Sequence, residues 1–115
     1  KRKDEMEVDK SFAAKIRTML FEVIPSGKGN VETIAREMAL SPRTIQRKLS
    51  EEKTTFMQQL NHTRELLAKN YLLNNEISSE EVAYLIGYSD VYAFMRAFRK
   101  WTGLTIKQYR IKHAV

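Results

Sequence analysis

Two segments of the chain place an arginine at the same point of a similar pattern. Residues 34–49 (IAREMALSPRTIQRKL) and 82–98 (VAYLIGYSDVYAFMRAF) each contain a small residue in a helical run, then a serine, then an apolar residue followed two positions later by arginine. These arginines are Arg47 and Arg96. A guanidinium can donate to both O6 and N7 of guanine, the commonest specific contact in the major groove of DNA. The repeated pattern therefore indicates side chains suited to reading bases.

Other side chains near these arginines have related chemistry. Gln46 precedes Arg47, and an amide can bond N6 and N7 of adenine as arginine bonds guanine. Arg43 lies near the predicted start of the same helix, within reach of a base or a phosphate. Tyr92 could stack on a base or pack against a sugar. The alternative for each is an ordinary surface side chain, either solvated, half-buried or paired with a carboxylate.

Basic and hydroxyl side chains around the same segments are assigned to phosphate contacts. Because neutralised phosphates release counterions, such contacts would make affinity depend on salt concentration. Any one of these side chains could instead be merely solvated. They are Ser41, Lys48, Lys53, Ser89, Arg99, Lys100 and Arg110.

Each segment predicts a helix-turn-helix, in which a first helix braces a second against the major groove. Ser41 followed by Pro42 is a strong start signal, since the hydroxyl accepts a free backbone N–H and proline has none to satisfy. We expect Ser89 to cap the second recognition helix in the same way. The copies align 48 residues apart in their first helices and 49 apart in their second. The extra residue is placed between Ser89 and Phe94, which predicts different poses of the two helices in their grooves.

Apolar periodicity and capping signals predict the remaining helices. They run from Ser11 to Ile24, from Asn30 onward, from Thr55 to about Asn74, from Ser78 to Gly87, and from Thr105 onward. Ser78 and Glu81 form the pattern of a capping box. The expected core residues are Leu49, Leu60, Tyr71, Phe94, Phe98 and Trp101, with Ala35 and Ala83 where paired helices approach closely.

These elements predict an all-α fold of seven helices, arranged as two helix-turn-helix lobes joined by a long central helix. Residues 1–10 are predicted to be a linker, 11–54 the first lobe, 55–75 the central helix and 76–111 the second lobe. Twenty residues at about 1.5 Å each give a central helix of roughly 30 Å. Successive major-groove faces lie about 34–36 Å apart, so the helix could hold the lobes one DNA turn apart.

Composition narrows the classes of function. The 115-residue chain has a net charge of +6. Residues 81–115 hold six Lys or Arg against two acids, whereas residues 59–80 hold two against three. The chain has no cysteine, no paired histidines at ligand spacing and no glycine-rich phosphate loop, so we expect no metal, no cofactor and no enzyme. No apolar run reaches the roughly 20 residues that span a bilayer, which predicts a cytoplasmic protein with no membrane partner.

Residues 87–110 (GYSDVYAFMRAFRKWTGLTIKQYR) resemble the signature of the AraC/XylS family of bacterial transcription regulators, and residues 38–49 (MALSPRTIQRKL) resemble that family's first helix-turn-helix. The resemblance extends from Ser11 to Arg110. It implies seven helices in two lobes, activation of transcription with RNA polymerase as a partner, and a separate N-terminal domain for effector binding and dimerisation. By position it implies base contacts from Arg43, Gln46, Arg47, Tyr92, Ala93 and Arg96.

Two departures from the family pattern bear on these expectations. Ile106 stands where the family usually has proline at the start of the last helix, which costs a few tenths to about 1 kcal/mol. Residues 91–93 (VYA) are less polar than a recognition helix often is. The second lobe is therefore expected either to read thymine methyls and DNA shape or mainly to grip the backbone.

The leading hypothesis is a sequence-specific double-stranded DNA binder that regulates transcription and is monomeric as this 115-residue piece. One alternative is a helical protein-interaction module whose basic faces meet an acidic partner. The other is a nucleic-acid binder with little preference between sequences. The paired arginines and capped helices favour the leading hypothesis.

Overall fold

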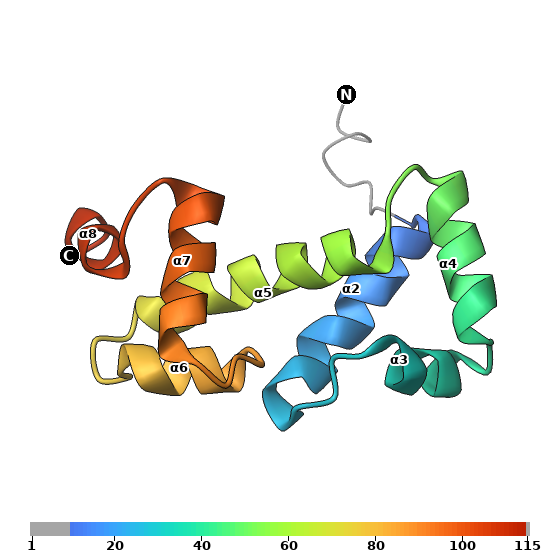
Figure 1. Cartoon of the computed structure of the whole chain (residues 1–115), viewed down its shortest axis with the longest axis horizontal. Coiled ribbons are helices and arrows are strands. Elements are labelled where there is room, and N and C mark those ends of the chain that lie inside the picture. The colour runs from blue at the N-terminus through green and yellow to red at the C-terminus, as the bar shows by residue number, and fades with distance from the viewer. Residues whose placement is uncertain (1–9, 115) are drawn as a thin grey trace, which may run out of the picture.

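The structure is a computed structural model that describes residues 10–114. The predicted linker over residues 1–10 therefore lies, apart from Lys10, outside the described part of the chain. Within residues 10–114 there are seven α-helices, one 3-10 helix and no strand (Figure 1), so the predicted all-α fold of seven helices is confirmed. The elements are α2 (Phe12–Val23), η1 (Ile24–Ser26), α3 (Val31–Met38), α4 (Pro42–Glu51), α5 (Phe56–Leu72), α6 (Ser79–Leu85), α7 (Val91–Thr102) and α8 (Ile106–Lys112).

Most of these helices begin at the polar residues that the sequence marks. The Ser41 hydroxyl accepts the backbone N–H of Thr44 at 3.0 Å, and Asn30 caps α3 through its side chain. Ser78 and Glu81 form the predicted reciprocal capping box at α6. Two further boxes open the helix that follows each recognition helix. They pair Thr55 with Gln58 at α5 and Thr105 with Gln108 at α8.

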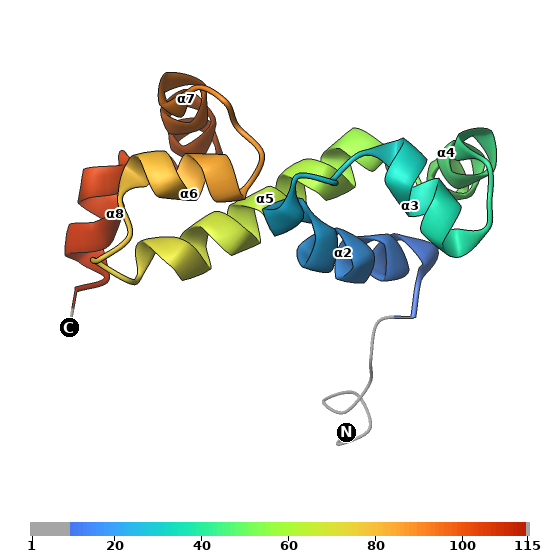
Figure 2. The same ribbon diagram turned by 90° about the horizontal axis from the view of Figure 1, so that it is seen from below.

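The central helix α5 joins two groups of helices (Figure 2). Helices α2, α3 and α4 gather around its first half, and α6, α7 and α8 around its second half. It has 17 residues, which is about 25 Å, so it is shorter than the predicted helix ending near Asn74. The reason is a local competitor: the Asn74 side chain accepts the N–H of Glu76 at 2.9 Å and turns the chain.

Apolar side chains from both lobes form the core along α5. Phe94, Phe98 and Leu49 are fully buried, as predicted, and Leu60 is nearly so. Ala35 and Ala83 are also buried, which fits their predicted place at close helix contacts. Tyr71 and Trp101 are only half-buried, because they pack against the edge of the core rather than within it. The Trp101 ring meets the edge of Phe98 with 6.4 Å between centroids.

Two contacts fasten the end of α4 to the start of α2. The Glu52 carboxylate accepts the backbone N–H groups of Phe12 and Ala13 at 2.8 and 2.9 Å. The Lys48 ammonium lies over the Phe12 ring, 5.4 Å from its centroid. A carboxylate at a helix N-terminus is favoured by the helix dipole. Glu52 therefore positions α4 by bonding a neighbouring helix.

Across residues 10–114, no helix combines the length and apolarity needed to cross a bilayer. The same part of the chain holds no group of three or more His, Asp or Glu side chains arranged to bind a metal ion.

A candidate DNA-binding face formed by α4 and α7

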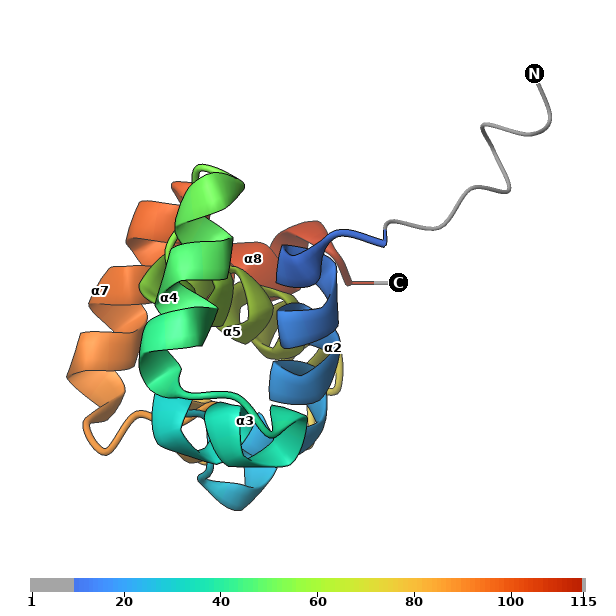
Figure 3. The ribbon, with the colours of Figure 1, turned by 90° about the vertical axis from the view of Figure 1, so that its right-hand side faces the viewer.

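The two recognition helices lie on the same side of the molecule. Figure 3 shows α4 and α7 together on the side opposite α2 and α8. In Figure 1 their axes are nearly parallel, and both helices run from bottom to top between their N-terminal and C-terminal ends. Each helix carries basic side chains on the surface away from α5. This arrangement presents two exposed helices to one partner surface.

On α4 the predicted base-contacting side chains share the exposed face. Arg43, Gln46 and Arg47 are exposed, whereas Ile45 and Leu49 on the opposite face are fully buried. The two buried side chains fix the rotation of α4 against the core. The three polar side chains are thereby held toward solvent, as the sequence predicted.

Arg47 has a partner in this structure. Its guanidinium lies 3.0 Å from the Glu51 carboxylate, one helical turn away, with 59% and 64% of the two side chains exposed. An exposed pair of this kind contributes only about 0.3–0.5 kcal/mol. The guanidinium can therefore leave Glu51 for a base at little cost.

On α7 the predicted residues are not all equally accessible. Tyr92 is 67% exposed and Arg96 is exposed, but Ala93 is half-buried beside the fully buried Phe94. Arg96 forms no ion pair within the described part of the chain, and Lys100 follows it where Glu51 follows Arg47. The α7 face is therefore more basic than the α4 face. Ala93 contributes at most a small apolar contact.

The predicted cap of α7 is wrong by one residue. Asp90, rather than Ser89, is the N-cap, and its carboxylate accepts the N–H of Tyr92 at 3.0 Å. Aspartate caps helices as well as serine does, and the sequence offers both side by side. With Asp90 as the cap, Phe94 follows it by four residues, as Ile45 follows Ser41. The two recognition helices therefore share one register, 49 residues apart.

The extra residue of the second copy lies in the turn instead of the helix. The turns match up to Leu40 and Tyr88, whose N–H groups donate to the carbonyls of Ala35 and Ala83, both at 2.9 Å. Ser89 is the inserted residue, and it is exposed. Cap, buried anchors and arginine are equally spaced in both helices, so the extra residue does not change the register within α7, and the different pose of the two helices in DNA stays a prediction.

Arg64 of α5 fixes the second turn. Its Nε donates to the carbonyl oxygen of Ile86 at 3.0 Å, and its guanidinium lies over the Tyr88 ring at 4.8 Å from the centroid. Gly87 has a φ of 98°, and a Cβ there would lie 3.1 Å from the guanidinium. The central helix thus holds the turn that aims α7.

The shared register identifies one residue that sequence reasoning missed. Counting 49 from Gln46 gives Met95, whose residue surface is 43% exposed on α7. Ala93, which the family resemblance implied as a base contact, is equivalent to Thr44, a half-buried position. Applying the 49-residue offset of the second helices to Gln46 would have found Met95.

The predicted phosphate contacts fall into two groups. Lys53, Arg99 and Lys100 are exposed near the ends of α4 and α7, and Ser89 is exposed in the second turn. The other members already have partners. Ser41 caps α4, and Lys48 is half-buried over Phe12.

Arg110 lies apart from the recognition face. Its guanidinium donates to the carbonyl oxygens of Asn74 and Ile77 at 3.2 and 2.6 Å, in the loop between α5 and α6. Figure 2 shows this loop on the side of α6 away from α7. Arg110 therefore connects α8 to the α5–α6 loop, a contact that the sequence pattern did not indicate.

Comparison with known proteins bears on what this face does. The sequence profile of a helix-turn-helix domain family matches residues 34–112. The ornithine utilization regulator of Pseudomonas aeruginosa is 36% identical over 105 residues, covering 91% of this chain and 31% of that protein. The crystal structure of a DNA-binding transcriptional dual regulator from Escherichia coli K-12 has a TM-score of 0.83 at 27% identity, over 90% of this chain and 99% of that one. The C-terminal domain of AraT, a response regulator from Geobacillus stearothermophilus, has a TM-score of 0.77 at 25% identity, over 90% and 87%.

Two capped recognition helices in one register, exposed on one side, define a two-lobed helix-turn-helix DNA-binding domain. The matching profile covers more than half of the chain, and the similar proteins are transcription regulators. The chain belongs to the AraC/XylS family of transcription regulators. It spans 31% of the length of the ornithine utilization regulator.

Proposed function

We propose that the chain binds double-stranded DNA with α4 and α7 in two successive major grooves on one face of the duplex. The observation that carries this proposal is the placement of two parallel helices, each capped by a polar side chain, on one side of a single central helix. A duplex offers its major groove to one face once per turn. Two exposed helices on one side of the molecule suit such a repeating surface better than they suit a single acidic partner protein.

Individual side chains have distinct roles in this proposal. Arg47 and Arg96 each donate to a guanine, and Gln46 contacts an adenine. Arg43 reaches a base or a phosphate near the start of α4, and Tyr92 packs on a base or sugar. Their support is exposure on the faces opposite the buried anchors.

Exposed cations at the ends of the two helices serve the DNA backbone. Lys53, Arg99 and Lys100 contact phosphates, so affinity falls as salt concentration rises. The free hydroxyl of Ser89 is available to a phosphate in the second turn.

The wider role follows from the family. We infer a bacterial regulator that activates transcription, works in the cytoplasm where the chromosome lies, and contacts RNA polymerase. Effector binding and dimerisation belong to a domain outside this chain, and the chain alone is a monomer. Its task is binding rather than catalysis.

The test is selection of duplexes from a randomised library, followed by affinity measurements on Arg47→Ala and Arg96→Ala. Each change should weaken binding by about 1–3 kcal/mol while leaving the helical circular dichroism unchanged. Lys15→Ala is the matched control and should have little effect, because Lys15 is an exposed cation on α2, a helix on the side of the molecule opposite α4 and α7. Binding without enrichment would indicate a non-specific binder. No binding even at low salt would favour the protein-interaction module.

A further inference from the structure

The shared register pairs each exposed residue of α4 with one of α7. Arg47 corresponds to Arg96, but Gln46 corresponds to Met95. Both side chains sit one residue before the arginine on a helix with buried anchors at equal spacing. The two lobes therefore present different chemistry at one equivalent position, an amide in the first and a thioether in the second.

Each of these side chains lines an equivalent surface depression between its recognition helix and the helix that follows. In the second lobe the depression has a volume of about 550 Å³ and is lined in part by Met95, Arg99, Thr105 and Ile106. In the first lobe it has a volume of about 480 Å³, and the corresponding lining residues are Gln46, Ser50, Thr55 and Phe56. Thr55 and Thr105 begin the following helices through the same type of capping box.

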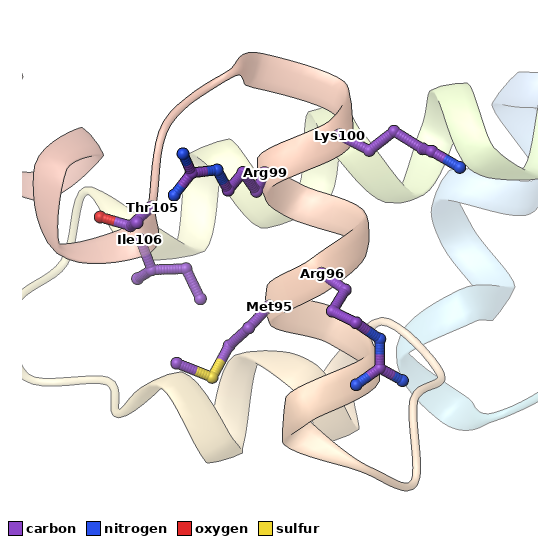
Figure 4. A pocket seen from close by; sticks show the side chains of 6 residues that line it. All are labelled: Met95, Arg96, Arg99, Lys100, Thr105 and Ile106. Carbon is purple, nitrogen blue, oxygen red and sulfur yellow. The ribbon is translucent and has the colours of Figure 1, made fainter.

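The second depression has an apolar wall. Figure 4 shows the Met95 side chain pointing toward Ile106, whereas Arg96 and Lys100 leave the other edge of α7. Ile106 is buried against the core, so the wall is fixed. Arg99 extends toward Thr105, above Met95 in the view. Met95 is thus an exposed apolar tip with the apolar surface of Ile106 behind it, on a depression whose other lining residues are cationic or hydroxyl side chains.

One group in the major groove matches this chemistry. The 5-methyl of thymine is the apolar group that a base pair presents there, whereas the amino groups, carbonyls and ring nitrogens are hydrogen-bonding groups. We propose that Met95 packs on a thymine methyl in the second half-site, at the position equivalent to the adenine that Gln46 contacts in the first. This assignment rests on the proposed DNA-binding function and makes the two half-sites different in sequence.

The first experiment removes the methyl group and nothing else. Duplexes selected by the wild-type 115-residue chain are resynthesised with deoxyuridine in place of each thymine in turn, and their dissociation constants are measured. Burial of one methyl is equivalent to about fourfold in affinity. One thymine in the second half-site should show this loss with the wild-type chain and no loss with Met95→Gln. If no replacement of thymine by deoxyuridine weakens binding of the wild-type chain, the proposal is wrong.

The second experiment exchanges the two chemistries. Selection with Met95→Gln should replace that thymine by adenine with a preference of about tenfold, because the amide can bond N6 and N7. Selection with Gln46→Met should introduce a thymine in the first half-site, and replacing that thymine by deoxyuridine should weaken binding. Ile111→Ala removes another exposed apolar side chain, on α8, and is expected to leave both half-sites unchanged.

The outcomes separate this inference from the proposed function. If the wild-type chain enriches a site but Met95→Gln selects the same site, DNA reading stands and the role of Met95 is wrong. If the wild-type chain enriches no site, both proposals fall. Met95 is exposed, so Met95→Gln should fold, and an unchanged unfolding temperature verifies this.

Discussion

Replacement of Asp90 by alanine tests the start of α7, which places the extra residue of the second copy in the turn. The Asp90 carboxylate accepts the backbone N–H of Tyr92 at 3.0 Å and so caps the start of α7. Loss of an aspartate cap costs about 1 kcal/mol, with a typical range of roughly 0.5–2 kcal/mol. For a domain of this size, about 1 kcal/mol lowers the unfolding temperature by about 4 °C.

Thermal unfolding followed by circular dichroism at 222 nm measures this effect directly. Asp90→Asn keeps an oxygen acceptor and should lose only a few tenths of a kcal/mol from the missing charge. Ser89→Ala is the matched control and should stay within about 0.5 kcal/mol of the wild type. A larger loss for Ser89→Ala than for Asp90→Ala would show that the helix starts at Ser89, and the extra residue of the second copy would then lie in the helix rather than in the turn.

Three further changes have defined outcomes. Glu51→Gln releases Arg47 from an exposed ion pair, so duplex affinity should rise about twofold in an electrophoretic mobility shift assay; a fall would show that Glu51 orients Arg47 for its base. Ala83→Leu overpacks a buried helix contact and should lower the free energy of unfolding, measured in urea, by about 1–3 kcal/mol. Unchanged stability would contradict this prediction. Arg110→Ala removes the bonds to the α5–α6 loop and should cost about 1–2 kcal/mol of stability, with the salt slope of DNA binding unchanged; a slope lowered by about 0.9 would instead assign Arg110 to a phosphate.

The helices and most of their starts could be predicted because their signals are local. Ser41, Thr55 and Ser78 each precede an apolar periodic run, and each caps the helix that follows. The α7 cap could not be chosen in this way, since Ser89 and Asp90 are adjacent and equally suitable. The spacing to the buried anchor Phe94 decided between them, and burial is a property of the packed fold.

The candidate site was predicted in part for the same reason. The exposed faces of α4 and α7 follow from helical periodicity, so Arg43, Gln46 and Arg96 were placed correctly on the surface. The partner of Arg110 lies more than thirty residues away in sequence, across the α5–α6 loop. Met95 was passed over because the second-lobe contacts followed the family resemblance, and the offset of 49 residues between the second helices was not applied to Gln46.

The parallel course of α4 and α7 has a consequence for the symmetry of the site (Figure 1). A twofold-symmetric dimer presents its recognition helices head to head and so matches a palindrome, which looks the same from either strand. Here the second lobe is related to the first by displacement along α5, and both recognition helices point the same way. The matching DNA is a tandem arrangement with a beginning and an end. In the proposed mode of binding, a single chain therefore lies on its site in one orientation and distinguishes upstream from downstream.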